Sequence, residues 1–250
     1  MGSRNRGGRL CAVVVLLAGL VMASAEAVVA DRHAPFDALL QKYVDDNGRV
    51  AYRDLAAHDG AALDVYLQTL AETDPKTLSQ SEQIAFWLNA YNARAIKGIL
   101  DGYDGEGFFA RKRFFALYSF PLAGQTRTLD DIENDILRAQ YREPRIHFAL
   151  VCASTSCPKL RREAYRGERL DAQLDEQARG FLTDPTRNQF GPGGVAKISM
   201  IFKWFADDFV TAAGSVPAYL GKWVTLPADA TIEYLEYDWT ANAQPGQRPE

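Results

Sequence analysis

The chain has 250 residues, of which 47% are hydrophobic and 24% charged, and its formal net charge is −4. That length is enough for one well-buried domain or for two small ones. The modest acidic charge and the lack of a long lysine and arginine run argue against nucleic acid as the main partner. Three cysteines are too few for a small disulfide-rich scaffold, so apolar packing must supply the core.

The first 25 residues have the pattern of a secretory signal peptide. A start with three arginines precedes an uncharged, mostly apolar stretch at 10–22, and Ala-Ser-Ala follows at 23–25. The alternatives are cleavage after residue 30 and an uncleaved N-terminal anchor. Because the apolar stretch is short for a membrane span, we expect an exported protein, periplasmic or secreted, without a membrane span after cleavage.

Residues 31–240 are then expected to form a single domain. The remaining segment, 241–250, is polar and contains proline and glutamine, so we predict a disordered tail there.

Apolar periodicity predicts more helices than strands. Short strands are expected to end near residue 52, to form a hairpin around 123–124, and to cover 145–152, 195–199 and 231–239. Helices are expected over 36–44, 63–70, 80–100, 170–182 and 202–210, with a further helix starting after Thr128. This irregular order favours an α+β fold over repeating βαβ units.

The helix expected over Gln80–Leu100 is the most informative element. Ser79 and Glu82 form a capping box at its start. Apolar residues lie on almost all of its sides, which is typical of a central, buried helix. Asn89 and Asn92 lie off its narrow polar strip, so their amides should be buried and hydrogen-bonded, either in a site or as ties to neighbouring backbone.

Several segments together resemble one known family, domain of unknown function 547. They are EQIAFWLNAYNARAIKGIL, LDDIENDIL, PRIHFALVCASTSCPKL, ERLDAQLDEQARGFLTDP, ISMIFKWFADDF and YLEYDW. The resemblance runs from about residue 35 to 240 and implies an exported bacterial domain with relatives in plants and animals, without an established reaction. The family often shows a histidine after LDDIE, where this chain has Asn134. If that histidine were a catalytic base, this chain would lack it.

The segment HFALVCASTSCPKL, at 147–160, joins one histidine to two cysteines. A zinc site is disfavoured because His147, Cys152 and Cys157 give only three ligands, at wider spacing than the usual C-x2-C pairs. The other histidines, His33 and His58, have no ligand-like spacing. We therefore predict neither a metal nor another cofactor.

A thiol enzyme is the alternative function. His147 is the only histidine in the family-like core, so it is the candidate base for a cysteine nucleophile. In a regular strand, residues five apart point to opposite faces, which separates His147 from Cys152 and favours Cys157 if the loop folds back. A hydrolase or transferase would then use Cys157, or Cys152, as its nucleophile.

The central helix before a histidine-bearing strand gives a distant analogy to papain-like and transglutaminase-like cores. The cysteine that begins the helix in those enzymes is absent here. The predicted fold is a single, helix-rich α+β domain whose central helix packs on a small mixed sheet containing 145–152.

We predict a disulfide between Cys152 and Cys157 in preference to free thiols, because the two cysteines lie close together in a chain that is expected to be exported. It would shape the loop at the end of the predicted strand. We therefore predict a binding or accessory module of the cell envelope for a small molecule, a peptide or an envelope component. Its pocket should lie near His147 and the 152–157 loop, and the predicted binding residues are Asn89, Tyr91, Asn92, Glu133, Arg145 and Ser154.

The segments WFADDF and YLEYDW place tryptophans beside acids, as a sugar-binding surface would. Ordinary core packing is preferred here. The neighbouring acids Asp207 and Asp208 would point about 100° apart in a helix, which does not match a paired acid and base. The rings expected in the core are Trp204, Phe205, Phe209 and Trp239.

Overall fold

The computed structural model describes residues 1–2, 31–103, 107–191, 194–226 and 230–248. The predicted signal peptide therefore lies outside the described residues, apart from its first two. The chain divides into a unit at Met1–Asp31 and a unit at Arg32–Glu250, and the second unit carries every element named below. No helix among the described residues has the length and hydrophobicity needed to cross a membrane.

The N-terminal half is helical. Helix α1 (Ala34–Tyr43) packs against α2 (Tyr52–Glu72), and the short η1 (Pro75–Thr77) leads to α3 (Gln80–Leu100). A turn at Asn47 and Gly48 joins α1 to α2: the amide of Gly48 donates to the carbonyl of Asp45, and Gly48 has a φ of 75°. A side chain at Gly48 would also collide with the backbone of Leu160, so this turn needs a glycine.

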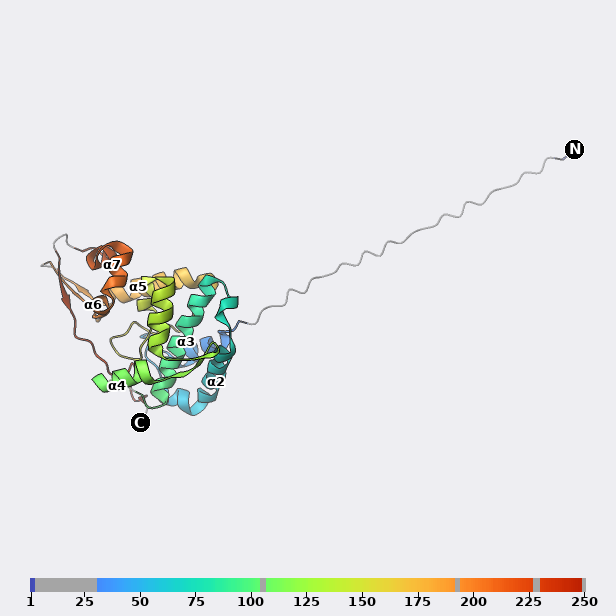
Figure 1. The fold of residues 1–250 in the computed structure, drawn as a ribbon, viewed down its shortest axis with the longest axis horizontal. Helices are drawn as coiled ribbons and strands as arrows, with labels where there is room; N and C mark the ends of the chain where they lie inside the picture. Colours follow the sequence, from blue (N-terminus) through green and yellow to red (C-terminus); the bar gives the residue numbers. More distant parts are fainter. Residues whose placement is uncertain (3–30, 104–106, 192–193, 227–229, 249–250) are drawn as a thin grey trace. The chain divides into compact units, whose positions relative to one another are not determined.

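Helix α3 is central, as its apolar pattern predicts. The capping box between Ser79 and Glu82 is formed at its start, and the residues from Ile84 to Ile96 are all buried. Its main neighbours are α2, η3 (Asp131–Tyr141) and η5 (Gly167–Arg169), and Figure 1 shows α2 and α3 side by side. Because it packs on all sides, α3 can present side chains to several parts of the unit at once.

Two small sheets complete the α+β fold. Strands β1 (Phe120–Leu122) and β2 (Gln125–Arg127) form the predicted antiparallel hairpin. The other sheet is mixed: β4 (Val195–Ile198) pairs antiparallel with β3 (Gln189–Phe190) and parallel with β5 (Thr231–Tyr234). The helix-rich α+β class is therefore confirmed.

The predicted strand at 145–152 is wrong, and so is its place in a sheet beside α3. Residues Pro144–Phe148 form a 3-10 helix, η4, and residues 149–153 have no regular structure. Pro144 occupies the first turn, and the side chain of Glu143 accepts the amide of Arg145, which starts a helical turn. A short apolar run has the same composition in a buried strand and in a buried helical turn, so its pattern did not distinguish them.

The remaining helices follow α3 in the chain. They are α4 (Phe108–Lys112), the π-helix η2 (Arg113–Leu117), α5 (Leu170–Thr183), α6 (Ile201–Trp204), α7 (Ala206–Ala213) and α8 (Val216–Leu220). The helix predicted at 202–210 is divided at Phe205, whose φ and ψ are −112° and 29°. Figure 1 shows α6 and α7 on the opposite side of this unit from α2.

The segment at 241–248 is bound to the rest of the unit, which differs from the disordered tail predicted there. The amide of Val50 donates to the carbonyl of Asn242, and the amide of Asn242 donates to the carbonyl of Ala153. Asn242 is buried as a result. Backbone hydrogen bonds can hold a polar segment against the rest of the unit without apolar side chains, and the composition of the segment does not reveal them. Residues 249–250 lie outside the described residues.

Candidate functional site

A cavity of about 300 Å³ opens beside the 152–157 loop, and it is called the His147 cavity here. Its polar lining comes from α3, from η3 and the residue before it, and from η4. It comprises Tyr91, Asp130, Glu133, Asn134 and His147. Its aromatic walls come from η2, from the end of α6 and from the segment after β5. They comprise Phe115, Trp204, Phe205, Tyr237 and Trp239.

The imidazole of His147 is held between two acids. Its Nε2 lies 2.7 Å from Oδ2 of Asp208, and its Nδ1 lies 3.8 Å from Oε1 of Glu133. The ring stacks on Phe205 with the centroids 4.0 Å apart. These contacts fix the orientation of the ring, with one nitrogen toward each carboxyl group.

Arg138 keeps Asp208 ionised. Its Nε donates to Oδ2 of Asp208 at 2.6 Å, and its Nη2 donates to Oδ1 at 3.0 Å. Burial opposes ionisation of Asp208, but the hydrogen bonds with His147 and Arg138 hold the pKa of this carboxyl well below its ordinary range. Since Asp208 is a carboxylate, it accepts the hydrogen of Nε2, which leaves Nδ1 as the unprotonated nitrogen of a neutral imidazole.

Burial lowers the pKa of His147 in spite of its carboxylate partner, so the imidazole is neutral near neutral pH. Its Nδ1 is buried and has no hydrogen-bond partner among the described residues. A buried acceptor without a donor is uncommon in proteins and is often found where a ligand or water completes the site.

Glu133 is the second unusual group. Its contacts in the unit are a 3.3 Å hydrogen bond from the hydroxyl of Tyr91 and the 3.8 Å approach to Nδ1 of His147. Burial raises the pKa of Glu133 to about 7, so its carboxyl group exchanges a proton near neutral pH. Tyr91 and Glu133, both predicted as site residues, therefore meet His147 at one cavity.

Asn134 stands where the family often has a histidine, and it joins two charged neighbours. Its amide donates to Oδ1 of Asp130 at 2.7 Å, and its carbonyl accepts from Nη1 of Arg138 at 2.6 Å. A carboxamide can donate and accept in this way at any pH. In this chain, the position therefore supports the charged residues of η3 without titrating.

Cys152 and Cys157 form the predicted disulfide, with their Cα atoms 6.3 Å apart. The amide of Cys152 donates to Sγ of Cys157 at 3.0 Å, and the hydroxyl of Tyr237 lies 3.3 Å from the same sulfur. Both cysteines line the His147 cavity. Because residues 147–152 do not form a strand, strand geometry does not separate His147 from Cys152. Both sulfurs are bonded in the disulfide, however, so neither is a thiolate.

Asn89 and Asn92 lie next to the site without lining it. Asn89 exchanges two hydrogen bonds with the backbone of Tyr165, at 2.8 and 2.9 Å. Asn92 donates to the carbonyl of Ala149 at 3.0 Å and accepts from the amide of Val151 at 2.9 Å. The amide nitrogen and the carbonyl oxygen of each side chain therefore have a backbone partner, and Asn92 holds the chain between η4 and the disulfide in place.

Arg145 and Ser154 also lie outside the lining of the His147 cavity. Arg145 forms an ion-pair cluster with Glu143 and Asp175, at 2.7 and 2.5 Å. Ser154 lies against the disulfide, 3.3 Å from Sγ of Cys157, and lines a neighbouring polar cavity of about 440 Å³. Among the predicted binding residues, Tyr91 and Glu133 are the two that line the His147 cavity.

The aromatic lining was missed because its rings were predicted to lie in the core. Phe209 is fully buried as predicted, but Trp204 is 42% exposed and packs beside Tyr237 and Trp239, with centroids 4.8 and 5.5 Å away. Asp208 was missed as the partner of His147, since the two are 61 residues apart. The tryptophans beside acids in WFADDF and YLEYDW were the available signal.

Residues 75–182 match a family described as "Protein of unknown function, DUF547". The matched segment contains α3, η3, η4, the disulfide and all of α5 except its last residue, and it ends before Asp208 and the two tryptophans of the cavity. No curated protein and no solved structure is significantly similar to the chain. The family match supports the resemblance over residues 75–182, where this chain is similar to a domain family of unknown function.

Proposed function

We propose that this protein is an exported cell-envelope module that binds a small molecule in the His147 cavity. One observation carries the proposal: an aromatic hollow of about 300 Å³ contains a buried acceptor, Nδ1 of His147, that lacks a donor among the described residues. Apolar walls with a few convergent polar groups are typical of small-molecule sites. A ligand with a hydrogen-bond donor would supply the partner that Nδ1 of His147 lacks.

Export is supported by the sequence pattern of the first 25 residues. The disulfide between Cys152 and Cys157 fits an oxidising compartment such as the periplasm. Mass spectrometry of the protein recovered from the producing cell tests this part of the proposal. We expect an N-terminus at residue 26 or 31, whereas an intact Met1 would contradict cleavage.

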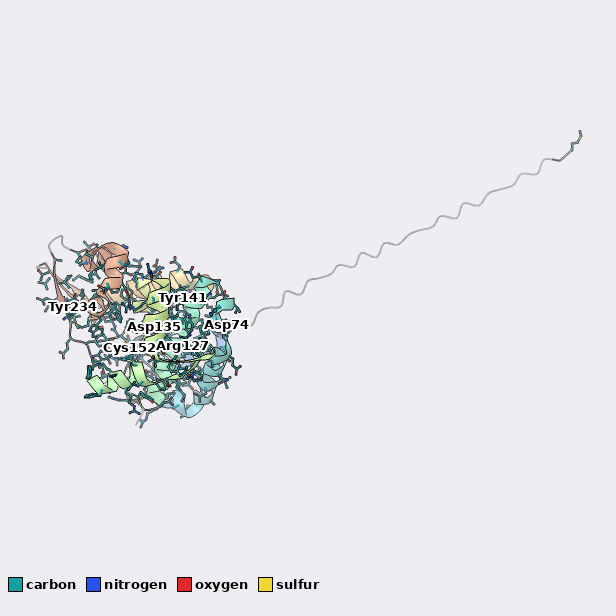
Figure 2. All side chains as sticks on the ribbon, viewed as in Figure 1. Asp74, Arg127, Asp135, Tyr141, Cys152 and Tyr234 are labelled. Carbon is teal, nitrogen blue, oxygen red and sulfur yellow. A yellow bond between two sulfur atoms is a disulfide. The ribbon has the colours of Figure 1, made fainter. Side chains whose placement is uncertain are left out.

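Ligand-detected NMR and thermal-shift screening test the binding function, with Trp204→Ala as the diagnostic variant. Trp204 forms part of the cavity wall and is 42% exposed, so its loss should cost little stability but weaken any cavity ligand about tenfold. Tyr234→Ala is the matched control because Tyr234 is 40% exposed and lies outside the cavity lining. Figure 2 shows Tyr234 at the edge of the unit, well apart from Cys152. Ligands that bind both variants equally well would contradict the proposed site.

The thiol enzyme remains the second candidate function, because both sulfurs line the same cavity as His147. It requires reduction of the disulfide, since a thiolate is the nucleophile. Thiol titration of protein purified without reductant separates the two functions. We expect fewer than roughly 0.2 reactive thiols per chain, whereas a higher value together with loss of activity in Cys157→Ser would favour the enzyme.

A further inference from the structure

The described lining of the His147 cavity carries negative but no positive charge. Asp130 and Glu133 contribute carboxyl groups, and no lysine or arginine belongs to the described lining. Arg138 is the cation that lowers the pKa of Glu133, and it is already bound to Asp208 and Asn134. Within the described part of the chain, Glu133 forms no ion pair with a lysine or arginine, and ionising a buried carboxyl group without such a partner is costly.

The aromatic walls supply the second half of a cation site. The rings of Trp204, Tyr237 and Trp239 lie next to one another, with centroids 4.5 to 5.5 Å apart. The negative π face of such rings attracts cations, and clusters of them recognise quaternary ammonium groups. The protein already places cations on rings of this lining: the guanidinium of Arg111 lies 4.7 Å from the centroid of Trp239, and that of Arg138 lies 4.9 Å from Phe205.

We propose that the His147 cavity selects a small organic cation, an amine or a quaternary ammonium compound, over a neutral molecule of the same shape. The inference rests on the proposed binding function and names the chemical class of its ligand. The cation lies against Trp204 and Tyr237, and the carboxylate of Glu133 neutralises it. A cavity of about 300 Å³ is at the small end of ligand sites, so the ligand is small.

Binding of a cation is then coupled to the ionisation of Glu133. The charged or titratable groups that interact with this carboxyl are Tyr91, Asp130, Arg138, His147, Asp208 and Tyr237. His147 is neutral, Arg138 and Asp208 form a pair, and Asp130 adds negative charge. A bound cation favours the ionised form of Glu133, so its affinity rises with pH through the pKa of about 7, by about tenfold between pH 6 and pH 8.

Choline and 3,3-dimethyl-1-butanol form a matched pair of probes, because the alcohol replaces the charged nitrogen by carbon. Both are titrated at pH 8 into the folded, disulfide-bonded protein, and binding is followed by tryptophan fluorescence and NMR. We expect choline to bind at least tenfold more tightly than the alcohol. Glu133→Gln keeps the shape of the side chain but removes its charge, so it should reduce this preference to about twofold or less.

Each outcome decides the inference. Equal affinity for both probes would overturn the selection of a cation, and an unchanged preference for choline in Glu133→Gln would overturn the role of Glu133 in that selection. If Trp204→Ala then weakened both probes and Tyr234→Ala neither, the proposed binding function would stand with a neutral ligand. Absence of any response to choline at millimolar concentration would also overturn the inference. Should neutral monosaccharides and the wider screen give no cavity ligand either, the proposed binding function would fail too.

Discussion

Two sets of buried polar side chains meet the same helix, α3, and they differ in one respect. Asn89 and Asn92 each form two hydrogen bonds with backbone, so the nitrogen and the oxygen of each amide have a partner. Tyr91 lies between them in sequence and donates instead to Glu133, which approaches the buried Nδ1 of His147, a nitrogen without a described partner. The two asparagines hold backbone segments together. The group around Glu133 instead leaves one acceptor, Nδ1 of His147, available at a cavity.

Burial of a polar group therefore does not by itself mark a binding site. A buried polar atom that has no hydrogen-bond partner at all is the better guide, because such atoms are uncommon and a ligand or water can supply the partner. Asn89 and Asn92 should therefore control the stability of the fold, whereas Glu133 and Tyr91 should control the pH dependence of stability and the binding of a ligand.

Asn92→Ala should give the largest effect. It leaves the carbonyl of Ala149 and the amide of Val151 without their buried partner, at a cost of about 2–5 kcal/mol in the free energy of unfolding. Urea denaturation measures it, with the half-buried Gln83→Ala of the same helix as control, for which we expect less than about 1.5 kcal/mol. An unchanged unfolding midpoint in Asn92→Ala would remove the distinction between the two sets.

Glu133→Gln should change the pH dependence of stability. Burial raises the pKa of Glu133 from 4.5 to about 7, so the protonated form is favoured in the folded protein. Below pH 4.5 the carboxyl is protonated in both states. As pH rises toward 7, the unfolded chain ionises first, and the wild type loses stability relative to the variant.

The size of this relative loss follows from the shift, at 1.36 kcal/mol per pKa unit, and is on the order of 3 kcal/mol between pH 4.5 and pH 8. Unfolding of both proteins across this range measures it, and Glu72→Gln on the exposed side of α2 is the control. A stability difference that is the same at both ends of the range would show that Glu133 is not destabilised by its burial.

Tyr91→Phe should have the smallest effect. It removes a 3.3 Å hydrogen bond to Glu133 and should lower the free energy of unfolding by less than about 1 kcal/mol. The same hydrogen bond holds the pKa of Glu133 down, so its loss should move the pH transition upward. A titration of Glu133 by NMR measures the shift. A transition at lower pH would contradict the contact described between these two side chains.

Local patterns predicted much of the helical framework. The capping box at Ser79 and the apolar residues on all sides of α3 depend on neighbours within two turns, and both were predicted from the sequence. The disulfide was also predictable, because its cysteines are five residues apart. The segment 145–152 was not, since its apolar run fits a short strand as well as the 3-10 turn that Glu143 and Pro144 begin.

The sequence by itself determined the buried helix, its capping box, the short disulfide loop and the family resemblance, since each depends on residues close together in the chain. The tertiary structure alone decided which polar groups share a cavity. It brought Asp208 to His147 across 61 residues, and placed Trp204 and Trp239 at the cavity wall instead of in the core. The physical reason is that burial and hydrogen-bond saturation depend on packing between distant segments, which no local periodicity records.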